Sequence, residues 1–380
     1  MANTLTKADI QIYIWKGDVN ARPSTPKYTL TKHKLSTEDI ITFEISELIK
    51  DYIVIDFDGN YQSIQQTRWV EYVVTSYFYN DETQVTTTET LEPQTAIAFR
   101  GYGNLKDGIN PELSKDILIS NRVVHNKCGE PLSIPMYVFE DGATKVKYFQ
   151  DATELETAVL GTADIYSIAQ SVNIAMPTNE VITIDRTATT QSDGDNTTDN
   201  QLLPPDTTKF TFTTADGTEK TINIECIEEC DYKGDAYKVS FVNKFGVMQD
   251  IWFFGKRTDT IGSERRGYKR STHKVTTDNV TFDRTKHQNQ YLDNQGSERF
   301  TMETGFIHES YNEVMKELMV SEFVYIHDKN QRSPSNPIYD LAVPIQVVTG
   351  SLQLKTRRFD KLINYKLDFE MDSEFVQSIR

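Results

Sequence analysis

Apolar and polar residues alternate with a period of two along much of this chain, and this alternation constrains its fold more than any other feature. In the stretch 364–371, Tyr365, Leu367, Phe369 and Met371 share one face of an extended strand, while polar residues share the other. Thr, Phe and Tyr, which favour strands, dominate most of the periodic segments. The pattern predicts a mainly β fold of half-buried antiparallel strands.

Two further patterns extend this prediction. Residues 69–79 are apolar on both faces, which is typical of a strand that lies centrally or against a second layer. The Asp-Gly pairs at 216–217 and 141–142 each separate two strand-like runs, and this spacing predicts two β-hairpins. We therefore expect two or three antiparallel β-sandwich-like domains.

A few short helices are predicted as the minority element. The clearest is an amphipathic helix over residues 309–320, with Glu317 largely outside its apolar stripe. The stripe consists of Tyr311, Val314, Met315 and Leu318. Two shorter helices are predicted at 46–51 and after 110–112, where residues that favour helix starts occur.

A polar segment at residues 186–206 divides the chain. It has almost no apolar content and is rich in Thr, Asp and Asn, a composition typical of a linker or a long surface loop. We therefore predict an N-terminal β-rich region at 1–185 and a C-terminal β-rich domain at 207–380. The N-terminal region either forms one unit or divides again near residue 93.

The acidic composition limits the function. The 380 residues include 56 Asp and Glu against 40 Lys and Arg, and the net charge of −16 disfavours unspecific binding to nucleic acid or anionic lipid. No apolar run approaches the roughly 18 residues that cross a bilayer, so we expect no membrane partner. Three cysteines form no even disulfide framework, which indicates a reducing compartment and incidental thiols.

The sequence contains no complete catalytic, cofactor-binding or metal-binding motif. Cys226 and Cys230 lack the second pair of ligands that a structural zinc site needs. Residues 193–199 depart from the calcium loop of an EF-hand, although a loose calcium site there stays open. Gly255-Lys256 lacks the earlier glycine of a phosphate loop. We therefore predict a protein without cofactor or metal that is not an enzyme.

The strongest local departure from the acidic character is a run of basic residues. It consists of Lys256, Arg257, Arg265, Arg266, Lys269, Arg270 and Lys274. An acidic patch on a neighbouring copy of the chain is the most economical partner for such a run, and we take these residues as a candidate subunit interface. A solvated loop and a contact with nucleic acid are the alternatives.

The stretch 230–254 contains Tyr-x-Val-x-Phe-Val-Asn-Lys-Phe-Gly at 237–246, followed by Trp-Phe-Phe at 252–254. It resembles structural proteins of tailed bacteriophage virions, especially those of phages of Bacteroidetes-like hosts. Residues 43–53 are similar to a strand-plus-short-helix element of this family, and residues 365–371 to its closing strand. The resemblance covers about a quarter of the chain and carries over no catalytic residues.

The resemblance implies a repeated β-rich building block of a tail, neck or baseplate. The expected partners are further copies of the chain and other virion proteins, and the expected location is the virion, after synthesis in the host cytoplasm. Two alternatives stay open. One is a module that binds a host-surface glycan or receptor through exposed aromatic residues. The other is a β-rich glycoside hydrolase, whose two carboxylates need not form a local motif.

Overall fold

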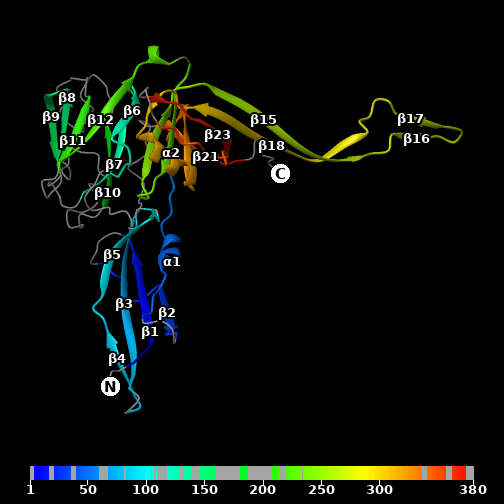
Figure 1. The fold of residues 1–380 in the computed structure, drawn as a ribbon. Coiled ribbons are helices and arrows are strands. Elements are labelled where there is room, and N and C mark those ends of the chain that lie inside the picture. The colour runs from blue at the N-terminus through cyan, green and yellow to red at the C-terminus, as the bar shows by residue number, and fades with distance from the viewer. Residues whose placement is uncertain are drawn as a thin grey trace.

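The computed structural model is built mainly from β-strands (Figure 1). Strands make up 54% of it and helices 7%, which confirms the prediction of a mainly β fold. The structure describes residues 4–16, 21–35, 40–59, 67–80, 83–103, 105–106, 108, 118–128, 130, 132–138, 145–159, 180–186, 208–213, 219–232, 234–335, 340–356 and 362–373. Four parts are distinguished below: a stalk, a middle region, a body and an arm.

The stalk is the elongated N-terminal part that points downwards in Figure 1. Its strands have the order β2-β1-β3-β4, and β5 also pairs with β3. The elements are β1 (Thr4–Trp15), β2 (Tyr28–His33), α1 (Ser46–Lys50), β3 (Thr67–Asn80), β4 (Val85–Thr90) and β5 (Gln94–Phe99). Ile10, Ile12 and Ile14 alternate along β1 and pack in one core with Ile49 of α1 and the nearby Ile53.

Two predictions concern the stalk. The short helix predicted at 46–51 is confirmed as α1. The strand predicted at 69–79 is confirmed as the central β3, which pairs with β1 on one edge and with both β4 and β5 on the other. Strand pairing therefore crosses residue 93, where a division of the N-terminal region was predicted.

The middle region contains one five-stranded sheet in the order β6-β12-β11-β8-β9 and a separate pair, β10-β7. Its strands are β6 (Val123–Lys127), β7 (Leu132–Val138), β8 (Lys145–Gln150), β9 (Thr153–Val159), β10 (Glu180–Arg186), β11 (Lys209–Thr213) and β12 (Glu219–Ile227). All described pairs are antiparallel except β6 and β12, which are parallel. The sheet joins strands from both sides of the segment 186–206.

This pairing bears on three predictions. The predicted boundary at 186–206 lies between strands of one sheet, and its residues after Arg186 lie outside the described residues. The hairpin predicted around 216–217 is confirmed, because β11 pairs with β12. The hairpin predicted around 141–142 is wrong, because both edges of β8 are occupied by β9 and β11. The helix predicted after 110–112 falls on residues outside the described ones.

The cysteine prediction is also corrected in the middle region. Cys128 and Cys226 form a disulfide across the neighbouring strands β6 and β12, and Cys230 is the exposed free thiol. The backbone explains the pairing, since the N–H of Cys128 donates to the carbonyl of Ile227, next to Cys226. These two thiols are therefore not incidental.

The body is a seven-stranded sheet in the order β14-β13-β20-β21-β23-β18-β15, with helix α2 in its core. Its elements are β13 (Tyr237–Val242), β14 (Met248–Phe253), β15 (Arg257–Lys269), β18 (Asn289–Glu303), β19 (Ile307–His308), α2 (Tyr311–Val320), β20 (Val324–Arg332), β21 (Asp340–Val347), β22 (Leu362–Ile363) and β23 (Lys366–Met371). A 3-10 turn at Glu229–Asp231 precedes it, and β19 pairs with β22.

The periodic patterns of the body are confirmed. Tyr365, Leu367 and Phe369 are buried, while Lys366 and Asp368 between them are exposed. Helix α2 corresponds to the predicted helix at 309–320, and its four predicted stripe residues are all buried. Together these side chains fill the core between α2 and the sheet.

The hairpin turn between β13 and β14 follows from its Asn-Lys-Phe-Gly sequence. The side-chain carbonyl of Asn243 accepts hydrogen bonds from the N–H groups of Phe245 and Val247. Gly246 has a φ of +74°, and a Cβ there would lie 2.7 Å from the backbone of Arg100. The turn is thus packed directly against the chain that leaves the stalk.

The arm is the outer part of the β15–β18 hairpin, residues 261–298, and it extends sideways from the body in Figure 1. Beyond β15 and β18 the chain forms a second small hairpin of β16 (His273–Val275) and β17 (Val280–Phe282). Residues 270–288, which include this hairpin, are called the arm tip.

Candidate interaction surfaces

The structure places the predicted basic residues along one hairpin and not in one compact patch. Arg257 lies at the base, where its guanidinium is 4.4 Å from the ring centre of Phe300 and its Nε is 2.7 Å from Asp259. The other six are exposed. Arg265 and Arg266 are consecutive in β15 and therefore point to opposite faces of the hairpin.

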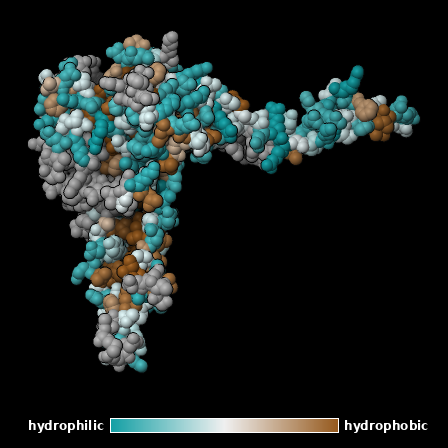
Figure 2. All heavy atoms as spheres, viewed as in Figure 1, coloured by the Kyte–Doolittle hydropathy of each residue, from teal (hydrophilic) through white to brown (hydrophobic). Residues whose placement is uncertain are grey.

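The arm also exposes apolar side chains, which the sequence analysis did not single out. They are Ile261, Tyr268, Val275, Val280, Phe282, Tyr291 and Leu292, with exposed fractions between 46% and 75%. Figure 2 shows hydrophobic residues near the end of the arm among hydrophilic ones. Each strand of the arm pairs only with the other one in the described structure, so no third strand covers it. Exposed apolar groups of this kind mark surfaces that bind a partner.

The tip is held by local contacts. Val275 faces Val280 in the β16–β17 register, and the rings of His273 and Phe282 lie 4.9 Å apart. The tip carries four Lys and Arg against two Asp, in contrast to the net −16 of the whole chain. It therefore presents an apolar centre with a basic surround.

A Ser, a His and an Asp meet inside the body, an arrangement that deserves comparison with a hydrolase triad. The Oγ of Ser240 lies 2.7 Å from Nε2 of His327 and 2.5 Å from Oδ1 of Asp250. The carboxylate thus accepts from the serine and does not orient the imidazole, as a triad requires. The three residues come from the neighbouring strands β13, β14 and β20.

Burial decides what this cluster does. Ser240 is fully buried and His327 nearly so, and burial, with the charge of Lys238, lowers the pKa of His327 well below its usual value. The adjoining cavity has a volume of about 10 Å³, room for no more than one water molecule. The cluster therefore satisfies buried polar groups within the core and gives a substrate no access.

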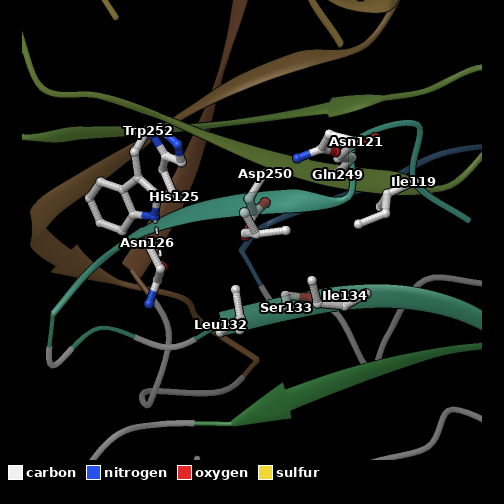
Figure 3. Close-up of a pocket in the computed structure, with 11 residues that line it drawn as sticks. Ile119, Asn121, His125, Asn126, Leu132, Ser133, Ile134, Gln249, Asp250 and Trp252 are labelled. Atoms are coloured by element: carbon white, nitrogen blue, oxygen red, sulfur yellow. Dashed lines mark hydrogen bonds between the residues drawn. The ribbon is translucent and has the colours of Figure 1, made fainter. Parts of the chain in front are cut away.

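That small cavity lies between the body and the middle region (Figure 3). The indole N–H of Trp252 donates to Asn126 at 2.9 Å, and the amide of Gln249 donates to Asn121 at 3.0 Å. The Oγ of Ser133 is buried there without a hydrogen-bond partner among the described residues. The lining therefore connects β14 of the body with β6 and β7 of the middle region through both polar and apolar side chains.

Glu317 of α2 corrects a sequence prediction, because it is buried and not on the wet side of the helix. It accepts hydrogen bonds from the Ser120 hydroxyl and the Lys244 backbone N–H, and the Lys244 ammonium lies 3.9 Å away. Burial raises its pKa, and this outweighs these favourable contacts.

A larger cleft of about 900 Å³ lies where the stalk meets the body. Its apolar lining includes Phe43, Ile45, Ile49, Ile53, Phe99 and Phe323. Glu322 bridges the two parts, with Lys50 at 2.9 Å and Arg100 at 2.7 Å. Hydrogen bonds from Arg100 and Lys50 lower the pKa of this carboxyl. The cleft joins residues more than 200 positions apart, so no local sequence signal could reveal it.

Clustered metal ligands and membrane-spanning helices are both absent from the described residues. In this part of the chain, no group of three or more His, Cys, Asp or Glu side chains is placed to hold a metal ion. The helices within the same residues are all too short or too polar to span a bilayer. The stretch 193–199, where a loose calcium site was left open, lies outside the described residues.

Comparison with protein-family models, curated proteins and solved structures gave no match for this chain. The resemblance to tailed-phage virion proteins therefore stays a prediction from the sequence.

Proposed function

We propose that this chain is a non-enzymatic structural component of a tailed-phage virion, in the tail or the head–tail connection, that assembles into a ring or a tube-associated oligomer. The supporting observation is the arm. It is a long hairpin that pairs with no other strand among the described residues beyond its base, and it exposes apolar and basic side chains along its length.

The physical argument concerns isolated hairpins. A two-stranded hairpin is marginally stable in water by itself, and a third strand or a second layer normally stabilises it. In the described structure the arm has neither beyond its base. A partner that covers it would bury the exposed apolar residues and stabilise its backbone pairing. Copies of the chain provide such a partner repeatedly, and a head-to-tail contact between copies closes a ring.

Light scattering after size-exclusion chromatography tests the assembly. The full chain is expected to reach masses that are multiples of 43.6 kDa, with the larger species favoured as concentration rises. Electron microscopy of phage particles labelled through a tag on this protein tests the location, and the label is expected at the tail or neck. A strict monomer at every concentration, also with virion proteins present, would contradict the proposal.

A further inference from the structure

The cleft between stalk and body has the chemistry of a receptor for an apolar, basic segment. Its floor consists of the aromatic and aliphatic side chains described above. Glu44 and Glu47, which also line it, are both exposed and acidic. The two basic lining residues, Lys50 and Arg100, are paired with Glu322. The cleft lining therefore carries three acidic groups against two basic ones, and its net charge is acidic.

The arm tip has the complementary chemistry. Phe282, Val275 and Val280 are 57% to 75% exposed in its centre. Lys274 is adjacent to Val275 in sequence, and Arg284 lies two residues after Phe282; both are exposed. Asp283, between Phe282 and Arg284, pairs with Lys286 at 3.2 Å. An apolar centre with basic neighbours thus matches an apolar floor with acidic neighbours.

The arm cannot bring its tip to the cleft of its own chain. It leaves the opposite side of the body from the middle region and extends away from the stalk (Figure 1). The 13 residues of β15 alone span about 43 Å at the rise of an extended strand. The tip is therefore placed to reach a different molecule.

We propose that the cleft of one copy receives the arm tip, residues 270–288, of a neighbouring copy. This rests on the proposed function and identifies the two faces of its head-to-tail contact. Two different faces of the same chain then meet at each contact, so one copy can engage a neighbour on either side, as a ring or a tube requires.

The charged groups of the cleft favour a protein segment over a small polar ligand. A small-molecule site places a few polar groups so that they converge on the ligand. Here Lys50 and Arg100 are both held by Glu322, which leaves an excess of one positive charge in this trio. Arg100 also donates to the carbonyl of Ile53 at 3.1 Å. What remains is an apolar surface with an acidic edge, which suits a hairpin tip with exposed Phe and Val side chains.

A charge exchange in the full chain tests the contact. Lys274→Glu with Arg284→Glu reverses the tip, and Glu44→Lys with Glu47→Lys reverses the cleft. Each pair of substitutions alone is expected to weaken self-association at least ~10-fold, because like charges then face each other. All four together in one chain are expected to restore most of it. As a matched control, Glu89→Lys with Glu92→Lys changes two exposed acids outside the cleft and should leave association unchanged.

Cross-linking tests proximity directly. In a Cys230→Ser background, which removes the exposed free thiol, one tagged chain carries Phe282→Cys and another carries Glu47→Cys. A short bismaleimide should join the two chains, and the pair Phe282→Cys with Glu89→Cys should join much less.

The outcomes separate the two proposals. If the wild-type chain assembles but the tip and cleft thiols cross-link no better than the control pair, the cleft is not the receptor and only this inference is overturned. The same holds if reversal of the tip abolishes assembly while reversal of the cleft has no effect. A wild-type chain that stays monomeric overturns the proposed function together with the inference.

Discussion

The two ends of the β15–β18 hairpin show how differently one structural element can be stabilised. At its base, Phe300 and Met302 of β18 are fully buried, and β18 pairs with β23 on its second edge. A few residues away in the arm, Tyr291 and Leu292 of the same strand are 58% and 72% exposed. Strand pairing continues through both ends, but burial stops where β23 ends.

Backbone pairing and core formation are therefore separate requirements for a stable hairpin. The base meets both within one chain, because β23 and α2 supply a third strand and a second layer. The arm has backbone pairing but no core, so its exposed apolar residues can be buried only by a partner. Substitutions at the base and in the arm should therefore have opposite consequences for folding and for association.

Truncation of a core side chain at the base should have the largest effect. Phe369 is fully buried and its ring lies 5.6 Å from the ring of Phe300. Phe369→Ala removes this packing and is expected to lower the free energy of unfolding by about 3–5 kcal/mol. Urea unfolding followed by tryptophan fluorescence measures it.

Phe282→Ala in the arm is the matched control for that experiment. Phe282 is 64% exposed in the single chain, so at a concentration where the chain is monomeric the same truncation should change the unfolding free energy by no more than about 0.5 kcal/mol. An equal loss in both variants would show that the tip is packed within a single chain, and the contrast between base and arm would fail.

Reversal of the arm charges should have the next largest effect, on association and not on folding. The variant with Arg265, Arg266, Lys269 and Arg270 all changed to Glu is expected to associate at least ~100-fold more weakly, because it repels an acidic partner. Its circular dichroism and unfolding midpoint should match those of the wild type. Light scattering across a concentration series measures the change.

The control reverses four basic residues outside the arm. They are Lys16, Lys27, Lys106 and Lys329, which are all exposed. If this control weakens association as strongly as the arm variant does, net charge governs assembly and the arm has no special role.

Part of this contrast could be predicted from the sequence. The core face of β23 was identified because apolar and polar residues alternate along this strand, so that residues two positions apart lie on the same face. A short stretch of sequence is therefore enough to predict which side chains are buried. The basic run of β15 was identified for the same reason, since charge is a local property. Its pairing with β18 was not identified, because this partner strand begins 20 residues after β15 ends.

The sites that were missed share a long separation in sequence. Ser240 meets His327 across 87 positions, and Cys128 meets Cys226 across 98, through pairings that depend on the order of whole sheets. Glu317 was expected to be exposed to solvent because it lies outside the single apolar stripe that the helical periodicity indicates. Its burial arises from Ser120 and Lys244, which belong to other elements.

Added salt should weaken association through the arm and leave the stability of the base unchanged, with a smaller effect than charge reversal. The arm charges are exposed, so added ions screen their attraction to a partner, while the apolar core at the base is insensitive to screening. Raising NaCl from about 0.05 to about 0.5 M is expected to weaken association ~10-fold and to leave the unfolding midpoint nearly unchanged. Association that strengthens with salt would indicate that apolar contacts of the arm dominate and that its charges do not.

The smallest effect concerns Glu317, a titrating group of the body that lies outside the arm. Because burial raises its pKa in the folded state, the unfolded chain loses this proton first as the pH rises above the ordinary value of 4.5. Its contribution to stability is therefore full below that pH and is lost as the pH rises towards the folded pKa.

Glu317→Gln cannot titrate and keeps an acceptor for the hydroxyl of Ser120. The variant should thus gain stability relative to the wild type between pH 4 and pH 7, by on the order of 1 kcal/mol. The exposed neighbour Glu313→Gln should show much less change, and urea unfolding at the two pH values measures both. A relative loss on raising the pH would mean that the contacts with Lys244 outweigh burial. The same gain is expected when the arm is replaced by a short turn between Gly262 and Ser297, because Glu317 contacts Ser120 and Lys244, which lie outside the arm.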